Sequence, residues 1–176
     1  ARSRVRWLEL DHPATQADKA ARAPAGGPTF VPADLRQDGA VEALVAGGLS
    51  LDRPSIYVLE GLTMYLPEPA VRRLLRDLAS VARGSRLSTD FYPPSGVGTG
   101  ANRRQDRLQR LARGGSGEDL RLQIGLDDAL DLVASEGWTV TDAQPTRDVA
   151  RRLVPPATGL PIDAINPAKT LLAARR

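Results

Sequence analysis

Three acidic side chains stand where apolar stretches of this sequence end: Asp11, Asp34 and Glu60. If those stretches are parallel strands, their carboxyl ends meet along one edge of a sheet, and open α/β sheets bind ligands at that edge. Gly61 follows Glu60 directly, and a glycine there lets a ligand approach the backbone. The spacing therefore predicts a ligand site lined by three carboxylates.

Three kinds of chemistry suit carboxylates in these places. One strand-end acid can accept hydrogen bonds from both ribose hydroxyls of a nucleotide. A second can accept one from the adenine amine, which only donates, while an apolar side chain such as Leu35 covers the base. Oxygen ligands also suit Mg²⁺ or Ca²⁺. Finally, Asp11 and Asp34 each precede a possible helix, where acids commonly act as caps. The residues alone leave all three open.

Strands and helices that could position these acids alternate along the chain. Strands are predicted over residues 4–11, 29–34, 56–59, 85–91, 138–144 and 169–174, and helices over 13–22, 41–47, 67–83, 101–113 and 127–136. Pro32 indicates that the second strand is an edge strand or an irregular one. Residues 147–167 contain too many prolines for an assignment. The alternation predicts an α/β fold with a parallel sheet.

The strand over residues 56–59 is central to this prediction. Its apolar run is nearly continuous, which is typical of a parallel strand covered on both faces. In the helix that follows, apolar residues recur every three or four positions, so one face should be buried. These residues are Val71, Leu74, Leu75, Leu78 and Val81.

Composition narrows the function. A length of 176 residues suits a single domain. The chain has no cysteine and one histidine, which excludes disulfides, thiolate nucleophiles, cysteine zinc sites and multi-histidine metal sites; we predict no metal. Apolar runs stay shorter than the roughly 18 residues of a membrane span, and no leader opens the sequence, so we expect a cytoplasmic protein with no membrane partner.

Charge gives weak guidance on partners. The formal net charge is +3, but the arginines are scattered among 21 acids and only 4% of residues are aromatic, so nucleic-acid binding is not favoured. The predicted helix over residues 101–113 is strongly basic. Its arginines could hold an acidic substrate, although a solvated helix face is the alternative. They are Arg103, Arg104, Arg107 and Arg110.

Three motifs follow one another in a specific order: Leu-Glu-Leu-Asp-His-Pro-Ala-Thr-Gln at residues 8–16, Val-Pro-Ala-Asp-Leu-Arg at 31–36, and Leu-Glu-Gly-Leu-Thr-Met-Tyr-Leu at 59–66. With Lys19, they resemble the leucine carboxyl methyltransferase family, most closely its bacterial S-adenosyl-L-methionine-dependent branch. The resemblance runs from about residue 5 to residue 92 and continues more weakly beyond. It implies a class I methyltransferase fold, a Rossmann-like sheet with helices on both faces in which all strands but the last are parallel.

The resemblance also implies how the cofactor S-adenosyl-L-methionine is held. Asp11 matches the acid that binds the ribose. Asp34 and Leu35 match the pair that binds the adenine. Glu60, followed by Gly61, matches the glutamate beside the methionine portion of the cofactor.

The methyl acceptor is less well defined. Tyr65 and Tyr92 lie where such folds build the acceptor pocket, and the resemblance carries no specific role to them. A carboxylate acceptor is already ionised at neutral pH and needs no general base, whereas a hydroxyl acceptor would need one. No catalytic residue can be named; His12 either packs at the strand end or touches the substrate.

One departure from the family matters. The family places a glycine-rich first strand and loop, then Asp-Thr-Arg, before the first motif, but the ten residues before Asp11 contain no glycine. We therefore expect the first strand and glycine loop to be missing and residues 1–176 to form a single, partial methyltransferase domain. The strand should lie between those ending in Asp11 and Glu60, and its absence would expose a sheet edge open to self-association.

The predicted function is that of an S-adenosyl-L-methionine-dependent O-methyltransferase acting on a carboxylate or hydroxyl of a small molecule. The alternative is a non-catalytic, methyltransferase-like scaffold or subunit without the cofactor glycine loop. A dinucleotide-dependent oxidoreductase is less favoured, because no G-x-G-x-x-G follows a strand.

Overall fold

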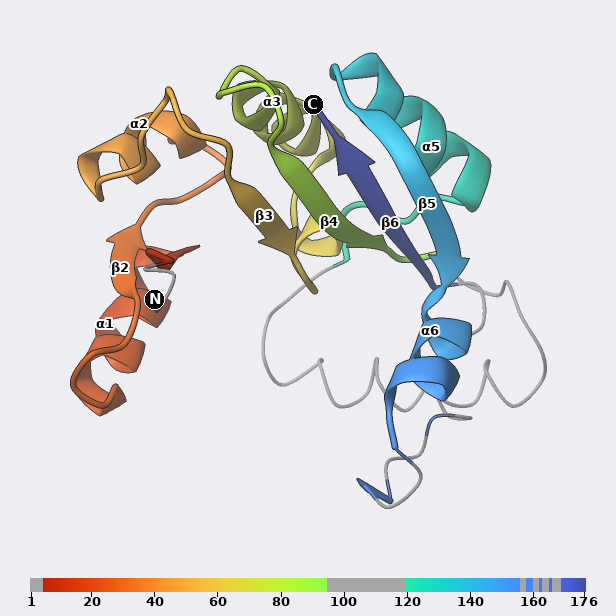
Figure 1. The fold of residues 1–176 in the computed structure, drawn as a ribbon, viewed down its shortest axis with the longest axis horizontal. Coiled ribbons are helices and arrows are strands. Elements are labelled where there is room, and N and C mark those ends of the chain that lie inside the picture. The colour runs from red at the N-terminus through yellow and green to blue at the C-terminus, as the bar shows by residue number, and fades with distance from the viewer. Residues whose placement is uncertain (1–4, 95–119, 156–157, 160–161, 163–164, 166–168) are drawn as a thin grey trace.

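Strands and helices alternate in the structure, a computed structural model that describes residues 5–94, 120–155, 158–159, 162, 165 and 169–176 (Figure 1). The strands are β1 (Leu8–Asp11), β2 (Thr29–Pro32), β3 (Ile56–Leu59), β4 (Arg86–Phe91), β5 (Thr139–Pro145) and β6 (Thr170–Arg175). The helices are α1 (Pro13–Arg22), α2 (Ala40–Ala46), the 3-10 helix η1 (Thr63–Tyr65), α3 (Glu68–Ala79), α5 (Leu126–Ser135) and α6 (Thr146–Leu153). The predicted α/β alternation is confirmed.

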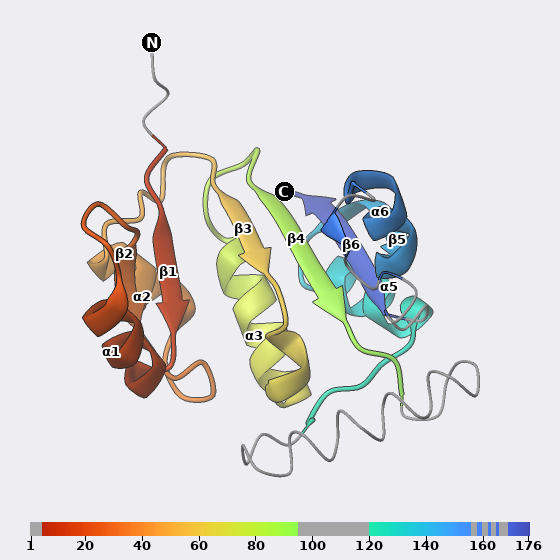
Figure 2. The same cartoon turned by 90° about the horizontal axis from the view of Figure 1, so that it is seen from below.

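The strands form two sheets. β1 and β2 pair in parallel, and the larger sheet has the order β3-β4-β6-β5. β3 and β4 are parallel, while β6 runs antiparallel to both β4 and β5. Figure 2 shows β1 and β3 pointing the same way with a gap between their ribbons, and the two strands share no hydrogen bonds. The resemblance places the family's first strand at this position.

The face of β3 opposite α3 is exposed, so the prediction of a strand covered on both faces is wrong. Side chains alternate across a strand. Tyr57 and Leu59 are 8% and 9% exposed, whereas Ile56 and Val58 are 76% and 62% exposed. A short apolar run looks the same whether one face or both are covered, and the outcome depends on the neighbouring elements.

α3 contributes six buried residues to the main hydrophobic core. Its predicted apolar face is buried, with Leu75 fully inaccessible. The indole Nε1 of Trp138 donates a hydrogen bond of 2.9 Å to the Leu75 carbonyl, and its ring meets Tyr57 edge-on with centroids 6.2 Å apart. Trp138 thus joins α3, the start of β5 and β3.

Helices lie on both faces of the β1–β2 sheet. The side chain of Leu8 approaches Gly47 at the end of α2, and Leu10 packs against the main core. Glu9 and Asp11 project to the other face, where Lys19 of α1 binds both. This confirms the implied arrangement of helices around these strands.

Some boundaries differ from the sequence-based ones. The first strand starts at Leu8, and α3 ends at Ala79 rather than near residue 83. α6 was not predicted from the sequence. Pro145 is its N-cap, and none of its residues is buried.

The predicted basic helix over residues 101–113 lies outside the described residues. Within the part that is described, no helix is long and apolar enough to cross a membrane.

Candidate functional site

Each of the three acids lies at the carboxyl end of its strand. Asp11 is the last residue of β1, Asp34 follows β2 by two positions, and Glu60 comes directly after β3. β1 and β2 are parallel, and Figure 2 shows β1 and β3 pointing in the same direction. The three strands thus end in the same direction, as the spacing predicts, but β1 and β2 belong to one sheet and β3 to the other.

Asp11 is held by α1. Its Oδ1 accepts a hydrogen bond from the His12 N–H at 2.7 Å, and its Oδ2 lies 2.9 Å from Lys19 Nζ. Hydrogen bonds to Glu9 first and to Asp11 second raise the pKa of Lys19 above its ordinary value. The side-chain cap of α1 is His12, whose Nδ1 accepts from the Ala14 N–H. Asp11 therefore fixes the turn before α1 without being its cap residue.

Asp34 is saturated by its near neighbours. Its Oδ1 accepts from the N–H and Nε of Arg36, at 3.1 and 2.8 Å, and its Oδ2 accepts from the Arg36 guanidinium and Gln37 Nε2, at 2.8 and 3.1 Å. An ionised carboxylate has about four acceptor sites. The hydrogen bonds from Arg36 hold the pKa of Asp34 well below its ordinary value of 3.8. An adenine amine would need a place that Arg36 or Gln37 now occupies.

Leu35 belongs to the hydrophobic core, with 9% of its surface exposed. Its carbonyl accepts a hydrogen bond of 3.0 Å from the guanidinium of Arg73 on α3. This contact fixes the turn after β2 against α3. The role of Leu35 at an adenine ring stays a prediction.

Glu60 differs from the other two acids. It is exposed and forms no hydrogen bond to any other described residue. Gly61 has a φ of +62° and donates its N–H to Asp90 Oδ1 at 2.9 Å. Glu60 is thus presented on a fixed turn with its carboxylate uncommitted within the described structure.

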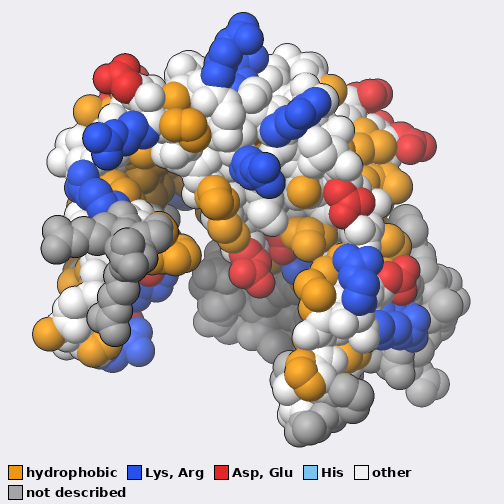
Figure 3. Space-filling view, viewed as in Figure 1, with side chains coloured by type: hydrophobic (Ala, Val, Ile, Leu, Met, Phe, Trp, Pro, Cys, Tyr) orange, Lys and Arg blue, Asp and Glu red, His pale blue; other side chains and the backbone are white. Residues whose placement is uncertain are grey.

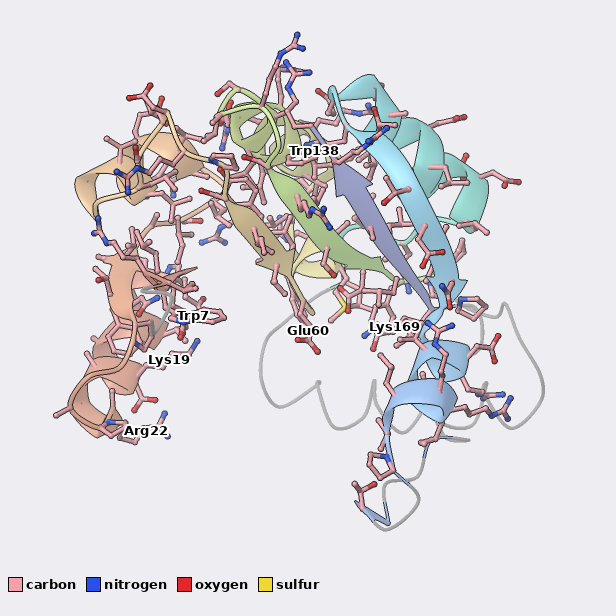
Figure 4. All side chains as sticks on the ribbon, viewed as in Figure 1. Trp7, Lys19, Arg22, Glu60, Trp138 and Lys169 are labelled. Carbon is pink, nitrogen blue, oxygen red and sulfur yellow. The ribbon has the colours of Figure 1, made fainter. Side chains whose placement is uncertain are left out.

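A buried ion pair that we did not predict lies beside this turn. Asp90, 3% exposed, places Oδ2 2.7 Å from Lys169 Nζ, and its carbonyl accepts from Thr63 Oγ1 at 2.7 Å. Lys169 Nζ also lies 5.0 Å from the centroid of the Tyr92 ring. Figure 4 shows Glu60 and Lys169 at the same end of the larger sheet. The acid near the end of the predicted strand 85–91 is a signal in the sequence, but its partner is far along the chain.

The two candidate acceptor-site tyrosines are near the same edge. Tyr65 ends η1, which contacts β4, and Tyr92 directly follows β4. Both are half-buried, and the Tyr92 carbonyl accepts from the Ile124 N–H at 2.9 Å. Their roles toward an acceptor stay predictions. Arg103, Arg104, Arg107 and Arg110 lie outside the described residues.

The described surface also contains hollows. Figure 3 shows one between the β1–α1–β2 part and the larger sheet. A separate groove of about 580 Å³, which includes Trp7 and Thr29, lies at the amino ends of β1 and β2, away from the three acids. Among the described residues, no group of three or more histidine or acidic side chains could hold a metal ion.

Comparison with known families identifies the motif region. Residues 1–79 match the family model described as leucine carboxyl methyltransferase. The matched region contains Asp11, Asp34 and Glu60. The predicted resemblance is therefore confirmed for this part of the chain.

Curated relatives extend the similarity. A protein of Mycolicibacterium paratuberculosis is 37% identical over 133 residues, covering 72% of this chain and 42% of the relative. One of Mycolicibacterium smegmatis is 34% identical over 172 residues, covering 85% of this chain and 51% of the relative. Both are provisionally named S-adenosyl-L-methionine-dependent methyltransferases. The chain spans about half the length of the curated relatives that it matches.

Solved structures share the fold. An S-adenosylmethionine-dependent methyltransferase from Mesorhizobium loti superimposes with a TM-score of 0.60 at 18% identity, over 96% of this chain and 80% of that one. LepI in complex with SAM gives 0.59 at 14% identity, over 99% of this chain and 37% of that one. These matches confirm the predicted class I methyltransferase fold.

Proposed function

Through residues 1–79 this chain is related to the leucine carboxyl methyltransferase family, and from that premise we propose that it forms part of an S-adenosyl-L-methionine-dependent O-methyltransferase. The observation that carries the proposal is that three acids of the matched region lie at the carboxyl ends of strands that point the same way. The fold shared with solved methyltransferases and the names of the mycobacterial relatives support it. The acceptor we propose is a carboxylate or hydroxyl of a small molecule.

Each acid has a distinct task in this proposal. Asp11 accepts from the ribose hydroxyls while Lys19 holds its carboxylate in place. Asp34 accepts from the adenine amine after Arg36 or Gln37 releases one of its four acceptor sites. Glu60, uncommitted among the described residues, accepts from the ammonium group of the methionine portion as a charge-assisted hydrogen bond.

In the proposed mechanism, the protein acts mainly by positioning the two reacting groups. When bound, the cofactor supplies a methyl group on a positively charged sulfur. The residues of the chain would accelerate methyl transfer mainly by holding the methyl donor and the acceptor in line and by excluding water. Tyr65 and Tyr92, half-buried at the strand ends, are the side chains that we propose to line the acceptor side.

We further propose that residues 1–176 are a single, partial domain whose cofactor site is completed by one more strand. The facing edges of β1 and β3 are not paired with each other. A strand between them would satisfy both edges, and a glycine loop after it would bring backbone N–H groups to the cofactor. Without that strand, the unpaired edges of β1 and β3 favour self-association.

Calorimetric titration with S-adenosyl-L-methionine tests the function. We expect binding by a chain extended upstream by a glycine-rich first strand, and weak or no binding by residues 1–176. Asp34→Ala should abolish binding, whereas Asp18→Ala, an exposed acid on α1, serves as the matched control. Binding by neither chain would refute the proposed cofactor.

A second candidate, a non-catalytic scaffold, is favoured by the saturation of Asp34. Folded chains that fail to bind the cofactor in both lengths, and that still fail after Arg36→Ala frees the carboxylate, would support it. Location in the cytoplasm, the lack of a nucleic-acid partner and self-association stay proposals. Sedimentation analysis showing a monomer at all concentrations would count against self-association.

A further inference from the structure

We propose that Asp90 and Lys169 are positioning residues that hold the turn after β3 so that Glu60 points toward the cofactor. The proposal rests on the cofactor role of Glu60 stated above. Neither residue needs to touch the cofactor, because both act through the backbone of Gly61 and the residues after it.

Asp90 fixes this turn at two points. Its Oδ1 accepts the Gly61 N–H at 2.9 Å, and its carbonyl accepts the Thr63 hydroxyl at 2.7 Å. Asp90 and Thr63 are 3% and 2% exposed, so water does not easily replace these bonds. One residue of β4 therefore holds both ends of the segment that follows Glu60.

The conformation of Gly61 shows why the Asp90 bond matters. Its φ of +62° lies in the left-handed region that glycine adopts without steric cost. No atom stands within 4 Å of where a Cβ would lie, so the glycine is required by its backbone conformation and not by lack of space. The hydrogen bond from the Gly61 N–H to Asp90 fixes the plane of the Glu60–Gly61 peptide, and this peptide carries the Cα from which the Glu60 side chain projects.

Lys169 makes the buried carboxylate possible. An unpaired carboxylate in this environment would be strongly unfavourable. The Lys169 ammonium lies 2.7 Å from Asp90 Oδ2, and the side chains are 18% and 4% exposed. Lys169 directly precedes β6, whose antiparallel register places Thr170 opposite Phe91. The pairing of β6 with β4 thus places the Lys169 ammonium beside the Asp90 carboxylate.

This arrangement couples a distant segment to the proposed cofactor site. The Tyr92 ring, 5.0 Å from the same ammonium, adds a cation–π contact that restrains Lys169 further. If the pair is lost, Gly61 loses its acceptor or Asp90 its counter-charge, and the Glu60 turn gains freedom. Loss of one hydrogen bond to a buried charged acceptor corresponds to roughly a tenfold or larger change in local opening.

Amide hydrogen exchange of Gly61, measured by NMR on residues 1–176, tests the structural step. Asp90→Ala should speed Gly61 exchange at least about tenfold relative to the Leu75 amide in the core. The double variant Asp90→Asn with Lys169→Met keeps an acceptor and buries no charge, so its exchange should stay within about threefold of the wild type. Glu136→Gln, which alters another buried acid away from the turn, is the control for general destabilisation.

Cofactor affinity of the extended chain tests the functional step. We expect Asp90→Ala to weaken S-adenosyl-L-methionine binding by roughly tenfold and the double variant to restore most of it. Unchanged Gly61 exchange in Asp90→Ala, or fast exchange in a folded double variant, would overturn the inference. Faster exchange with unchanged affinity would overturn it too. Failure of the wild-type extended chain to bind would instead refute the proposed function, while the exchange data would still decide whether the pair holds the turn.

Discussion

Replacing Glu136 with glutamine should lower the free energy of unfolding by about 2 kcal/mol, while the same change at Glu68 should lower it by less than about 0.5 kcal/mol. Both glutamates bind Arg72, which makes them a matched pair. The Glu136 side chain is 4% exposed, and that of Glu68 is 48% exposed. The comparison therefore isolates burial at a common partner.

The magnitude follows from the contacts. Glu136 accepts from Arg72 at 3.1 Å and from two nitrogens of Arg76 at 2.9 and 2.8 Å, which joins α3 to the turn before β5. Charged hydrogen bonds contribute about 1.5–3 kcal/mol each. The arginine side chains are 37% and 67% exposed and can return to water, which reduces the total loss to about 2 kcal/mol. The exposed ion pair between Glu68 and Arg72 should contribute as little to the free energy of unfolding as surface ion pairs usually do.

Urea denaturation followed by far-UV circular dichroism provides the assay, with the slope against urea expected to stay unchanged. Adding 0.5 M salt should remove most of the Glu68 contribution and leave most of that of Glu136, because buried pairs are screened less. Equal losses for the two variants, or a loss below about 0.5 kcal/mol for Glu136→Gln, would refute this reasoning.

Three further predictions follow from burial and pairing. Arg36→Ala should raise the pKa of Asp34 toward its ordinary value of 3.8 in an NMR titration. Because the folded pKa is depressed, Asp34 stabilises the wild type above pH 3.8 and loses that effect as the pH falls below it. Identical acid-unfolding curves for the wild type and Arg36→Ala would contradict the pairing. Val58→Ser should cost less than about 1 kcal/mol and Leu59→Ala about 2–4 kcal/mol in urea unfolding, and similar costs would contradict the one-sided burial of β3. Trp138→Phe should cost about 1–2 kcal/mol by the same measurement through loss of its buried hydrogen bond, and a neutral effect would show that bond to be dispensable.

Local patterns predicted much of the fold. The 3–4 spacing of Val71 to Leu78 requires one buried face, and α3 buries it. The strand 56–59 was placed correctly because a short apolar run bounded by turn residues has few alternatives. The exposure of Val58 was not predictable, because burial of the second face depends on which elements lie over it. The helix α6 was missed because its apolar content is low and prolines surround it.

The candidate site was predictable in part. Asp11, Asp34 and Glu60 lie at the carboxyl ends of their strands, as their spacing indicates, because β1 pairs in parallel with β2 and β3 points the same way as β1. Which acid remains uncommitted depends on partners. Arg36 follows Asp34 by two residues, and such a short-range pair can be anticipated. Lys169 meets Asp90 only through the register of β6, which no local pattern contains.

The position of β6 between β4 and β5 determines when the larger sheet can form during synthesis. β6 pairs with both strands but follows them in the sequence. During synthesis, β4 and β5 leave the ribosome before the strand that must separate them, so their edges stay unpaired until β6 emerges. Sheet closure therefore depends on long-range pairing, which folds slowly. Lys169 arrives with β6, so Asp90 receives its counter-charge and the Glu60 turn its final support only in this late step.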